Sequence, residues 1–140
     1  SKNTNTYEVE LVDDLKCEFP RLDERRAGLN YRFGYMACDS RPKTKGGLFN
    51  SIARVDHQSG KIQMHELPLG HATNEPVFVP IRESSGEGEG VLLTNVYDAN
   101  KNSSYLLILD AENVDSDPLA LVNLDHRVPF GFHGNWMPAQ

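Results

Sequence analysis

Short apolar runs alternate with clusters of Gly, Asn, Asp and Ser along the whole chain, and no segment carries a sustained helical repeat of apolar residues. Runs of this length and composition are typical of strands, so the pattern predicts a mostly β chain. We expect strands at 31–38, 47–56, 61–67, 76–81, 90–97, 104–111 and 119–124. Residues 56–60 and 98–103 are typical of hairpin turns, the first ending in a Gly that can supply a positive φ. Antiparallel meanders are therefore predicted.

The two halves of the chain carry the same order of features. Residues 17–20 open one run of strands that ends near Leu67, and residues 74–78 open a second that ends near Leu124. Glu18, Glu75 and His133 follow one another at nearly equal separations, since 75 − 18 = 57 and 133 − 75 = 58. Four-stranded repeats are typical of propeller blades, whose equivalent inner positions meet near one axis. On the residues alone, a propeller and a sandwich both stay open.

Composition and charge narrow the classes of partner. The 140 residues are 39% hydrophobic, enough for one core, and 20 acidic residues outnumber 14 basic ones. A net charge of −6 without a basic cluster argues against nucleic acid. The longest apolar run, 105–109, is far shorter than the ~20 residues of a membrane-spanning helix. Because the polar start also lacks an apolar signal-like stretch, we expect a cytoplasmic protein.

Two further features carry little chemistry. Cys17 and Cys38 match neither a zinc site nor a disulfide framework, so buried, reduced thiols are expected. Residues 83–90 alternate Gly with acidic residues, which predicts a mobile loop in solvent rather than a phosphate cradle.

The segment 125–136 is the densest in reactive and aromatic side chains. Glycines lie close to His133 on both sides, which suits an imidazole that must reach a crowded centre. Phe130, Phe132 and Trp136 could form an apolar wall around it. The same residues also fit an exposed histidine on an ordinary aromatic hairpin, and their spacing does not decide between the two.

Four ordered motifs carry a family resemblance: Glu18-Phe19-Pro20-Arg21, and the segments 74–80, 105–111 and 127–134. With them, the chain from about Cys17 onward resembles the C-terminal part of the carotenoid oxygenases, non-haem iron dioxygenases that cleave carotenoids, apocarotenoids and related stilbenes. The resemblance implies an all-β fold made of antiparallel four-stranded units, the last blades of a seven-bladed β-propeller. Residues 17–140 would then be a partial domain, and residues 1–16 a flexible N-terminal segment or an artificial start of the chain.

The resemblance also implies a site. In this family four histidines hold one Fe(II) on the propeller axis, and His133 matches one of them, which makes it the candidate catalytic and metal-binding residue. Glu18 and Glu75 match glutamates that stand behind ligand histidines, where a carboxylate accepts the second ring N–H and compensates the metal charge. Phe130, Phe132 and Trp136 become candidates for lining the substrate tunnel, although core packing explains them equally well.

The implied activity is oxidative cleavage of a conjugated C=C bond of a carotenoid or apocarotenoid by O2, giving carbonyl products. The other histidine ligands would lie in the remaining N-terminal blades, because His57, His65, His71 and His126 are not at ligand positions. The segment alone is therefore expected to be inactive. A stilbene-cleaving member, and a β-rich binding or interaction module without iron, are the alternatives. Exposed strand edges predict an edge-to-edge homodimer of the fragment, and peripheral membrane contact of the parent protein stays open.

Overall fold

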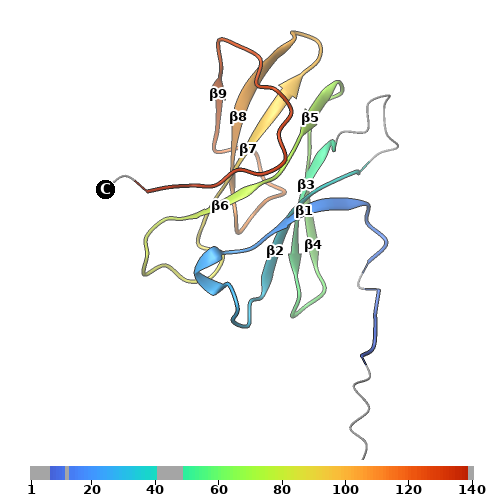
Figure 1. The fold of residues 1–140 in the computed structure, drawn as a ribbon, viewed down its shortest axis with the longest axis vertical. Helices are drawn as coiled ribbons and strands as arrows, with labels where there is room; N and C mark the ends of the chain where they lie inside the picture. The colour runs from blue at the N-terminus through green and yellow to red at the C-terminus, as the bar shows by residue number, and fades with distance from the viewer. Residues whose placement is uncertain (1–6, 12, 41–48, 139–140) are drawn as a thin grey trace, which may run out of the picture.

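The computed structural model describes residues 7–11, 13–40 and 49–138, and its regular structure is almost entirely β. Figure 1 shows two antiparallel sheets side by side. The first contains β1 (Cys17–Arg21), β2 (Phe33–Cys38), β3 (Ser51–Asp56) and β4 (Ile62–Glu66), in this order. The 3-10 helix η1 (Glu24–Arg26) connects β1 to β2. The second sheet contains β5 (His71–Thr73), β6 (Val77–Pro80), β7 (Gly90–Asp98), β8 (Ser103–Asp110) and β9 (Ala120–Asn123).

Each sheet has four strand positions side by side, in agreement with the four-stranded units that the sequence predicts. In the second sheet β8 pairs with β7 from Val91 to Asp98, so β5 and β6 must share the other edge of β7. The two strands are one interrupted strand: Thr73 lies opposite Val96 and Val77 opposite Leu93, which leaves one extra residue between them. β1 has a similar irregularity between Glu18 and Arg21. Bulges of this kind redirect side chains, and here both occur at the glutamate motifs.

All the expected strands are present, with ends that differ by a few residues; residues 47 and 48 of the second expected strand lie outside the described part of the chain. The hairpin turn predicted at residues 56–60 is confirmed, and it ends at Gly60, which has φ 73°. β1 and β5 are not predicted as strands, because neither contains an apolar run: β1 includes a proline and two charged residues, and β5 has only three residues. Within the described ranges the helical residues form a single short turn, and no helix could cross a membrane.

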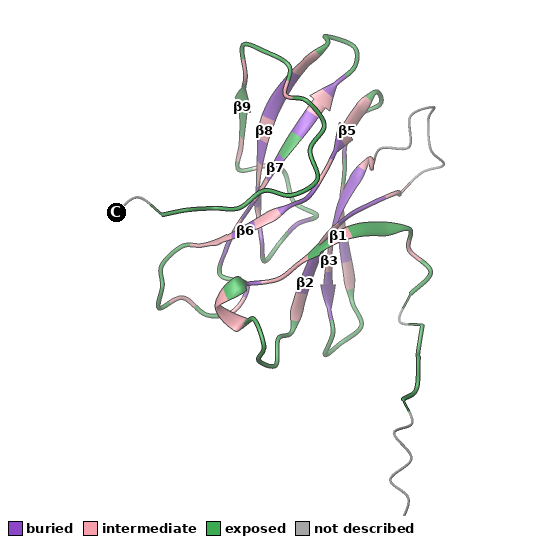
Figure 2. Ribbon diagram, viewed as in Figure 1, coloured by how far each residue is buried: buried purple, intermediate pink, exposed green. Residues whose placement is uncertain are grey.

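The core lies where the two sheets face each other, as the buried positions in Figure 2 show. Tyr35 of the first sheet stacks on Phe78 of the second, with ring centroids 5.6 Å apart and planes at 9°. Along β7 buried positions alternate with less buried ones, which is the period of a strand with one face in the core. At Gly90 a Cβ atom would meet the carbonyl oxygen of Val79 and lie 2.6 Å from the Phe78 ring, so the two strands approach too closely for any side chain.

Two smaller expectations need correction. Both cysteines are free, but Cys17 is exposed and only Cys38 is buried. The Gly-rich loop is bound to the first sheet rather than moving freely in solvent. The guanidinium of Arg25 donates to the carbonyl oxygens of residues 82, 83, 85 and 86, and the Glu87 carboxylate accepts the main-chain N–H groups of Arg32 and Phe33.

Candidate functional site

The C-terminal segment, residues 125–138, turns back after β9 and crosses the second sheet over β6 (Figure 1). It contains no regular secondary structure. Its position therefore depends on individual contacts. Near its start, the Val128 N–H donates to the Ser104 hydroxyl at 3.0 Å. Further along, His133 and Gly134 are held by one carboxylate, that of Glu75.

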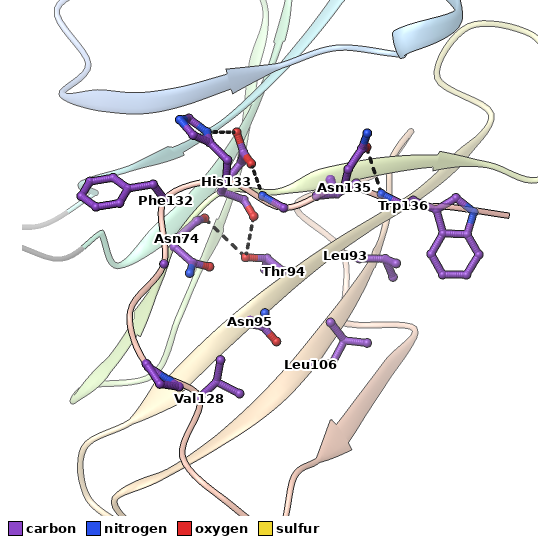
Figure 3. A pocket seen from close by; sticks show the side chains of 15 residues that line it. Asn74, Leu93, Thr94, Asn95, Leu106, Val128, Phe132, His133, Asn135 and Trp136 are labelled. Atoms are coloured by element: carbon purple, nitrogen blue, oxygen red, sulfur yellow. Dashed lines mark hydrogen bonds and ion pairs between the residues drawn. The ribbon is translucent and has the colours of Figure 1, made fainter.

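Glu75 lies in the interruption between β5 and β6, at the position where the strand breaks its pairing with β7. Its main-chain carbonyl accepts a hydrogen bond from the Thr94 hydroxyl on β7 at 3.3 Å. Its side chain is nearly buried, with 6% exposed. The carboxylate accepts the His133 Nδ1–H at 3.1 Å and the Gly134 N–H at 2.8 Å, which are the dashed contacts beside His133 in Figure 3. It also pairs with the Arg21 guanidinium at 2.9 Å.

These contacts determine the charge of Glu75 and the tautomer of His133. Burial opposes ionisation of Glu75, but the Gly134 N–H, the His133 ring and Arg21 together outweigh it, so the pKa of Glu75 lies below its usual value. An ionised carboxylate can only accept hydrogen bonds, so in the neutral imidazole of His133 the hydrogen lies on Nδ1 and the lone pair on Nε2. The His133 side chain is 77% exposed. A neutral imidazole with an accessible lone pair is a suitable ligand for a divalent first-row metal.

β1 supplies a second contact to the same imidazole. The ring of Phe19 lies edge to face with the His133 ring, at 6.0 Å between centroids, and makes a similar contact with Phe49. Phe19 has φ 57°, an uncommon conformation for a non-Gly residue, and it lies in the bulge of β1. The bulge therefore directs an aromatic ring from the first sheet toward the histidine on the C-terminal segment.

A cavity of about 250 Å³ lies between the C-terminal segment and the second sheet (Figure 3). Phe132 and Trp136 are part of its wall, at opposite ends of the view, and His133 lies on its rim. The apolar part of the wall also includes Val77, Leu93, Leu106 and Val128, and the polar part includes Asn74, Thr94 and Asn95. Phe130 lies outside this cavity. Its ring packs edge to face on Tyr97 at 5.5 Å, with the Arg127 guanidinium beside it.

Comparison with known proteins decides the family. The family described as "RPE65: Retinal pigment epithelial membrane protein" matches residues 1–138. The chain belongs to this family, the carotenoid oxygenases. Because solved carotenoid oxygenases superpose on the chain and have a β-propeller fold, the two sheets are propeller blades rather than the layers of a sandwich.

Relatives with different substrates match nearly the whole chain. The apocarotenoid-15,15'-oxygenase of Synechocystis sp. is 32% identical over 94% of this chain and 26% of its own length. The lignostilbene-alpha,beta-dioxygenase isozyme III of Sphingomonas paucimobilis is 35% identical over 99% of the chain and 30% of its own length. The cobalt-substituted Synechocystis apocarotenoid oxygenase structure superposes with a TM-score of 0.85 at 31% identity, covering 93% of this chain and 27% of that one. The chain thus spans less than a third of these carotenoid oxygenases.

The two glutamates of the carotenoid oxygenase motifs have different surroundings. Glu75 contacts His133, as described above. Glu18 lies on β1 opposite Ala37 and is exposed, and within the described residues no hydrogen bond joins it to a histidine. The four-residue motif that contains Glu18 contributes to the His133 site through Phe19 and Arg21 instead. Sequence reasoning missed Arg21, and the only signal for it was its place in that motif.

The other histidines of the chain lie in surroundings of their own, away from His133. His71 contacts the Tyr105 hydroxyl at 3.0 Å and Asp98 at 3.4 Å, and His57 packs edge to face on Tyr31. Burial lowers the pKa of His65, and exposed His126 pairs with its neighbour Asp125. Within the described part of the chain, no three His, Cys, Asp or Glu side chains gather closely enough to hold a metal ion. A metal bound to His133 would need ligands beyond those that the described residues bring together.

Proposed function

We propose that this chain is the C-terminal segment of an iron(II)-dependent dioxygenase that cleaves a conjugated C=C bond of a carotenoid or apocarotenoid, consuming O2 and giving carbonyl products. The observation that carries the proposal is the pair formed by Glu75 and His133, which leaves Nε2 available as a ligand. Membership of the carotenoid oxygenase family supports the activity. The cobalt-substituted form of a structural relative supports a metal-dependent site.

The residues present suit one ligand position of such a site. His133 would hold iron(II) through Nε2, together with histidines of the remaining N-terminal blades. Bound iron(II) supplies the activation of O2 for addition across the substrate C=C bond. Glu75 retains the hydrogen on Nδ1, fixes the orientation of the ring and makes the imidazole a stronger donor, while its negative charge partly compensates the metal. We propose the same supporting role for Glu18 toward a histidine outside this chain.

The cavity beside His133 supports an apolar substrate. Phe132, Trp136 and aliphatic residues line this cavity together with His133, and we propose Phe132 and Trp136 as part of the substrate wall. At about 250 Å³, the cavity is below the ~300–1,000 Å³ of typical ligand pockets, so this chain would form only part of the binding site. Phe130, which lies outside the cavity, would stabilise the C-terminal segment through Tyr97 and Arg127.

A stilbene substrate is the second candidate, and one observation favours it. The lignostilbene-alpha,beta-dioxygenase isozyme III matches 99% of the chain at 35% identity. Stilbenes also carry a conjugated C=C bond, so the His133 site would serve either substrate. Incubation of the intact parent protein with an apocarotenoid or a stilbene, followed by identification of the carbonyl products, separates the two.

Mutation of His133 in the intact parent protein tests the proposal. His133→Ala should remove a ligand, so that metal analysis shows loss of bound iron and cleavage stops. His126→Ala is the matched control, because His126 is exposed and its ionic partner among the described residues is its neighbour Asp125, and it should retain iron. Full iron content in His133→Ala would contradict the assignment. The 140-residue segment supplied with iron(II) should cleave neither substrate, since it contributes only one of the proposed ligands; turnover would refute that part.

A further inference from the structure

Arg21 connects the two blades and the C-terminal segment through a single guanidinium group. The residue lies at the end of β1, in the first blade. One of its terminal nitrogens pairs with the Glu75 carboxylate at 2.9 Å and donates to the Gly134 carbonyl oxygen at 2.8 Å. The other donates to the Asn135 side-chain oxygen at 3.3 Å and pairs with Glu24. The Arg21 side chain is 14% exposed, so it is nearly as well buried as Glu75 and better buried than Glu24, Gly134 and Asn135.

The main chain next to His133 is held on both sides by this arrangement. The Gly134 N–H donates to Glu75, and the Gly134 carbonyl accepts from Arg21. Because the C-terminal segment has no sheet hydrogen bonds at this point, these two contacts carry much of the positional restraint on the residue that precedes them. Arg21 also occupies Glu75 Oε2, so that Oε1 remains for the His133 Nδ1–H. A planar guanidinium can hold several acceptors in a fixed geometry, which a single ammonium cannot do.

We propose that Arg21 is a positioning residue for metal binding by His133. It fixes the Glu75 carboxylate and the Gly134 peptide before a metal binds, so that the imidazole is already oriented as a ligand. Less ordering is then required on binding, and the affinity is higher. This inference rests on the proposed function of His133. In this view, the arginine of the Glu18-Phe19-Pro20-Arg21 motif supports the histidine held by the next blade, rather than the blade that contains the arginine.

Arg25 is a matched control, because it bridges the same two blades without touching the site. Its guanidinium pairs with Asp23 at 2.6 Å and donates to carbonyl oxygens of the loop before β7. Among the described residues, Arg25 forms no hydrogen bond or ion pair with Glu75 or the C-terminal segment. Loss of Arg25 therefore removes a comparable inter-blade bridge and leaves the His133 environment unchanged.

The experiment compares Arg21→Met, Arg21→Lys and Arg25→Met in the intact parent protein. Iron(II) affinity is measured by competition with a chelator, and the thermal midpoint is measured on the metal-free proteins. Arg21→Met should weaken iron binding by roughly 10–100-fold, the usual effect of losing a residue that supports a metal ligand. Arg21→Lys should fall between wild type and Arg21→Met, because it restores the charge opposite Glu75 but not the fixed planar geometry of the guanidinium or its second nitrogen, which contacts Asn135. Arg25→Met should lower the thermal midpoint and retain wild-type affinity.

Wild-type affinity in Arg21→Met would overturn the inference. So would an equal loss of affinity in Arg25→Met, because Arg21 would then act only by stabilising the fold. If Arg21→Met does not fold, Arg21→Lys decides: wild-type affinity in that variant is the negative result. His133→Ala distinguishes failure of the Arg21 proposal from failure of the proposed function. Loss of iron in His133→Ala with normal affinity in Arg21→Met rejects the role of Arg21 alone, whereas full iron content in His133→Ala rejects the proposed function itself.

Discussion

Replacement of Glu75 by Gln tests how the C-terminal segment is held. The carboxylate accepts hydrogen bonds from the His133 ring and the Gly134 N–H, and it forms an ion pair with Arg21. Gln has one oxygen and one NH2 group at the same positions. With its NH2 at the Oε2 position, the amide faces the Gly134 N–H and Arg21, which are also donors. With its NH2 at the Oε1 position, it faces the Nδ1 of His133, which can accept only if the ring hydrogen moves to Nε2. The substitution therefore removes an ion pair and also either opposes two donors or changes the His133 tautomer.

The size of the effect follows from the burial of each partner. A hydrogen bond to a charged group contributes about 1.5–3 kcal/mol, and removing one member of a buried ion pair costs about 3–5 kcal/mol. The His133 side chain is 77% exposed, so its contact adds little to stability. Arg21 and Gly134 carry most of the loss, and Arg21 is not fully buried. We expect Glu75→Gln to weaken attachment of the C-terminal segment by about 2–4 kcal/mol.

Trp136 provides the assay, because it is the only tryptophan of the chain and lies two residues after Gly134. Its fluorescence reports release of the C-terminal segment, whereas far-UV circular dichroism reports the sheets. In urea, the wild-type transitions should coincide, and in Glu75→Gln the fluorescence transition should move to lower denaturant than the circular dichroism transition. Glu18→Gln is the control: Glu18 is exposed, so both transitions should stay in place. A Glu75→Gln chain with wild-type midpoints by both probes would refute the reasoning.

Three further predictions concern pH, thiol chemistry and packing. Folding lowers the pKa of Glu75, so its carboxylate contributes fully to the free energy of unfolding above the ordinary pKa of 4.5, and this contribution is lost as pH falls through the lower folded value. The stability difference between wild type and Glu75→Gln should therefore close in acid. A difference that persists in acid would contradict this. Burial raises the pKa of Cys38 to about 12, so a thiol reagent should label exposed Cys17 in the folded chain and Cys38 only after denaturation; equal labelling without denaturant would be the contrary result. Gly90→Ala should destabilise the chain to urea by about 1–3 kcal/mol through overpacking, whereas Gly131→Ala, which meets no atom within 4 Å, should not; equal midpoints for the two variants would show that the strands can separate at low cost.

Much of the fold was predictable because strand signals are local. The alternation of side chains along β7 and β8 has the same period in the sequence as in the sheet, so these strands were found at nearly their observed bounds. β1 and β5 are not predicted, because β1 contains a proline and two charged residues among its five positions and β5 has only three residues, so neither shows an apolar run. Their extended conformation depends on β2 and β7, to which they pair.

The candidate site, like the fold, was predictable in part. The amino-acid order alone indicates the residue types of the site: a histidine between glycines, and two glutamates in matching motifs at nearly equal separations. The folded chain is needed to show that Glu75 contacts His133 while Glu18 is exposed, that Phe130 lies outside the cavity, and that Arg21 reaches across from the first blade. This is because a pattern along the chain specifies only which face of a strand a residue occupies. The partner that a side chain meets depends on bulges, and on how separately folded sheets pack together.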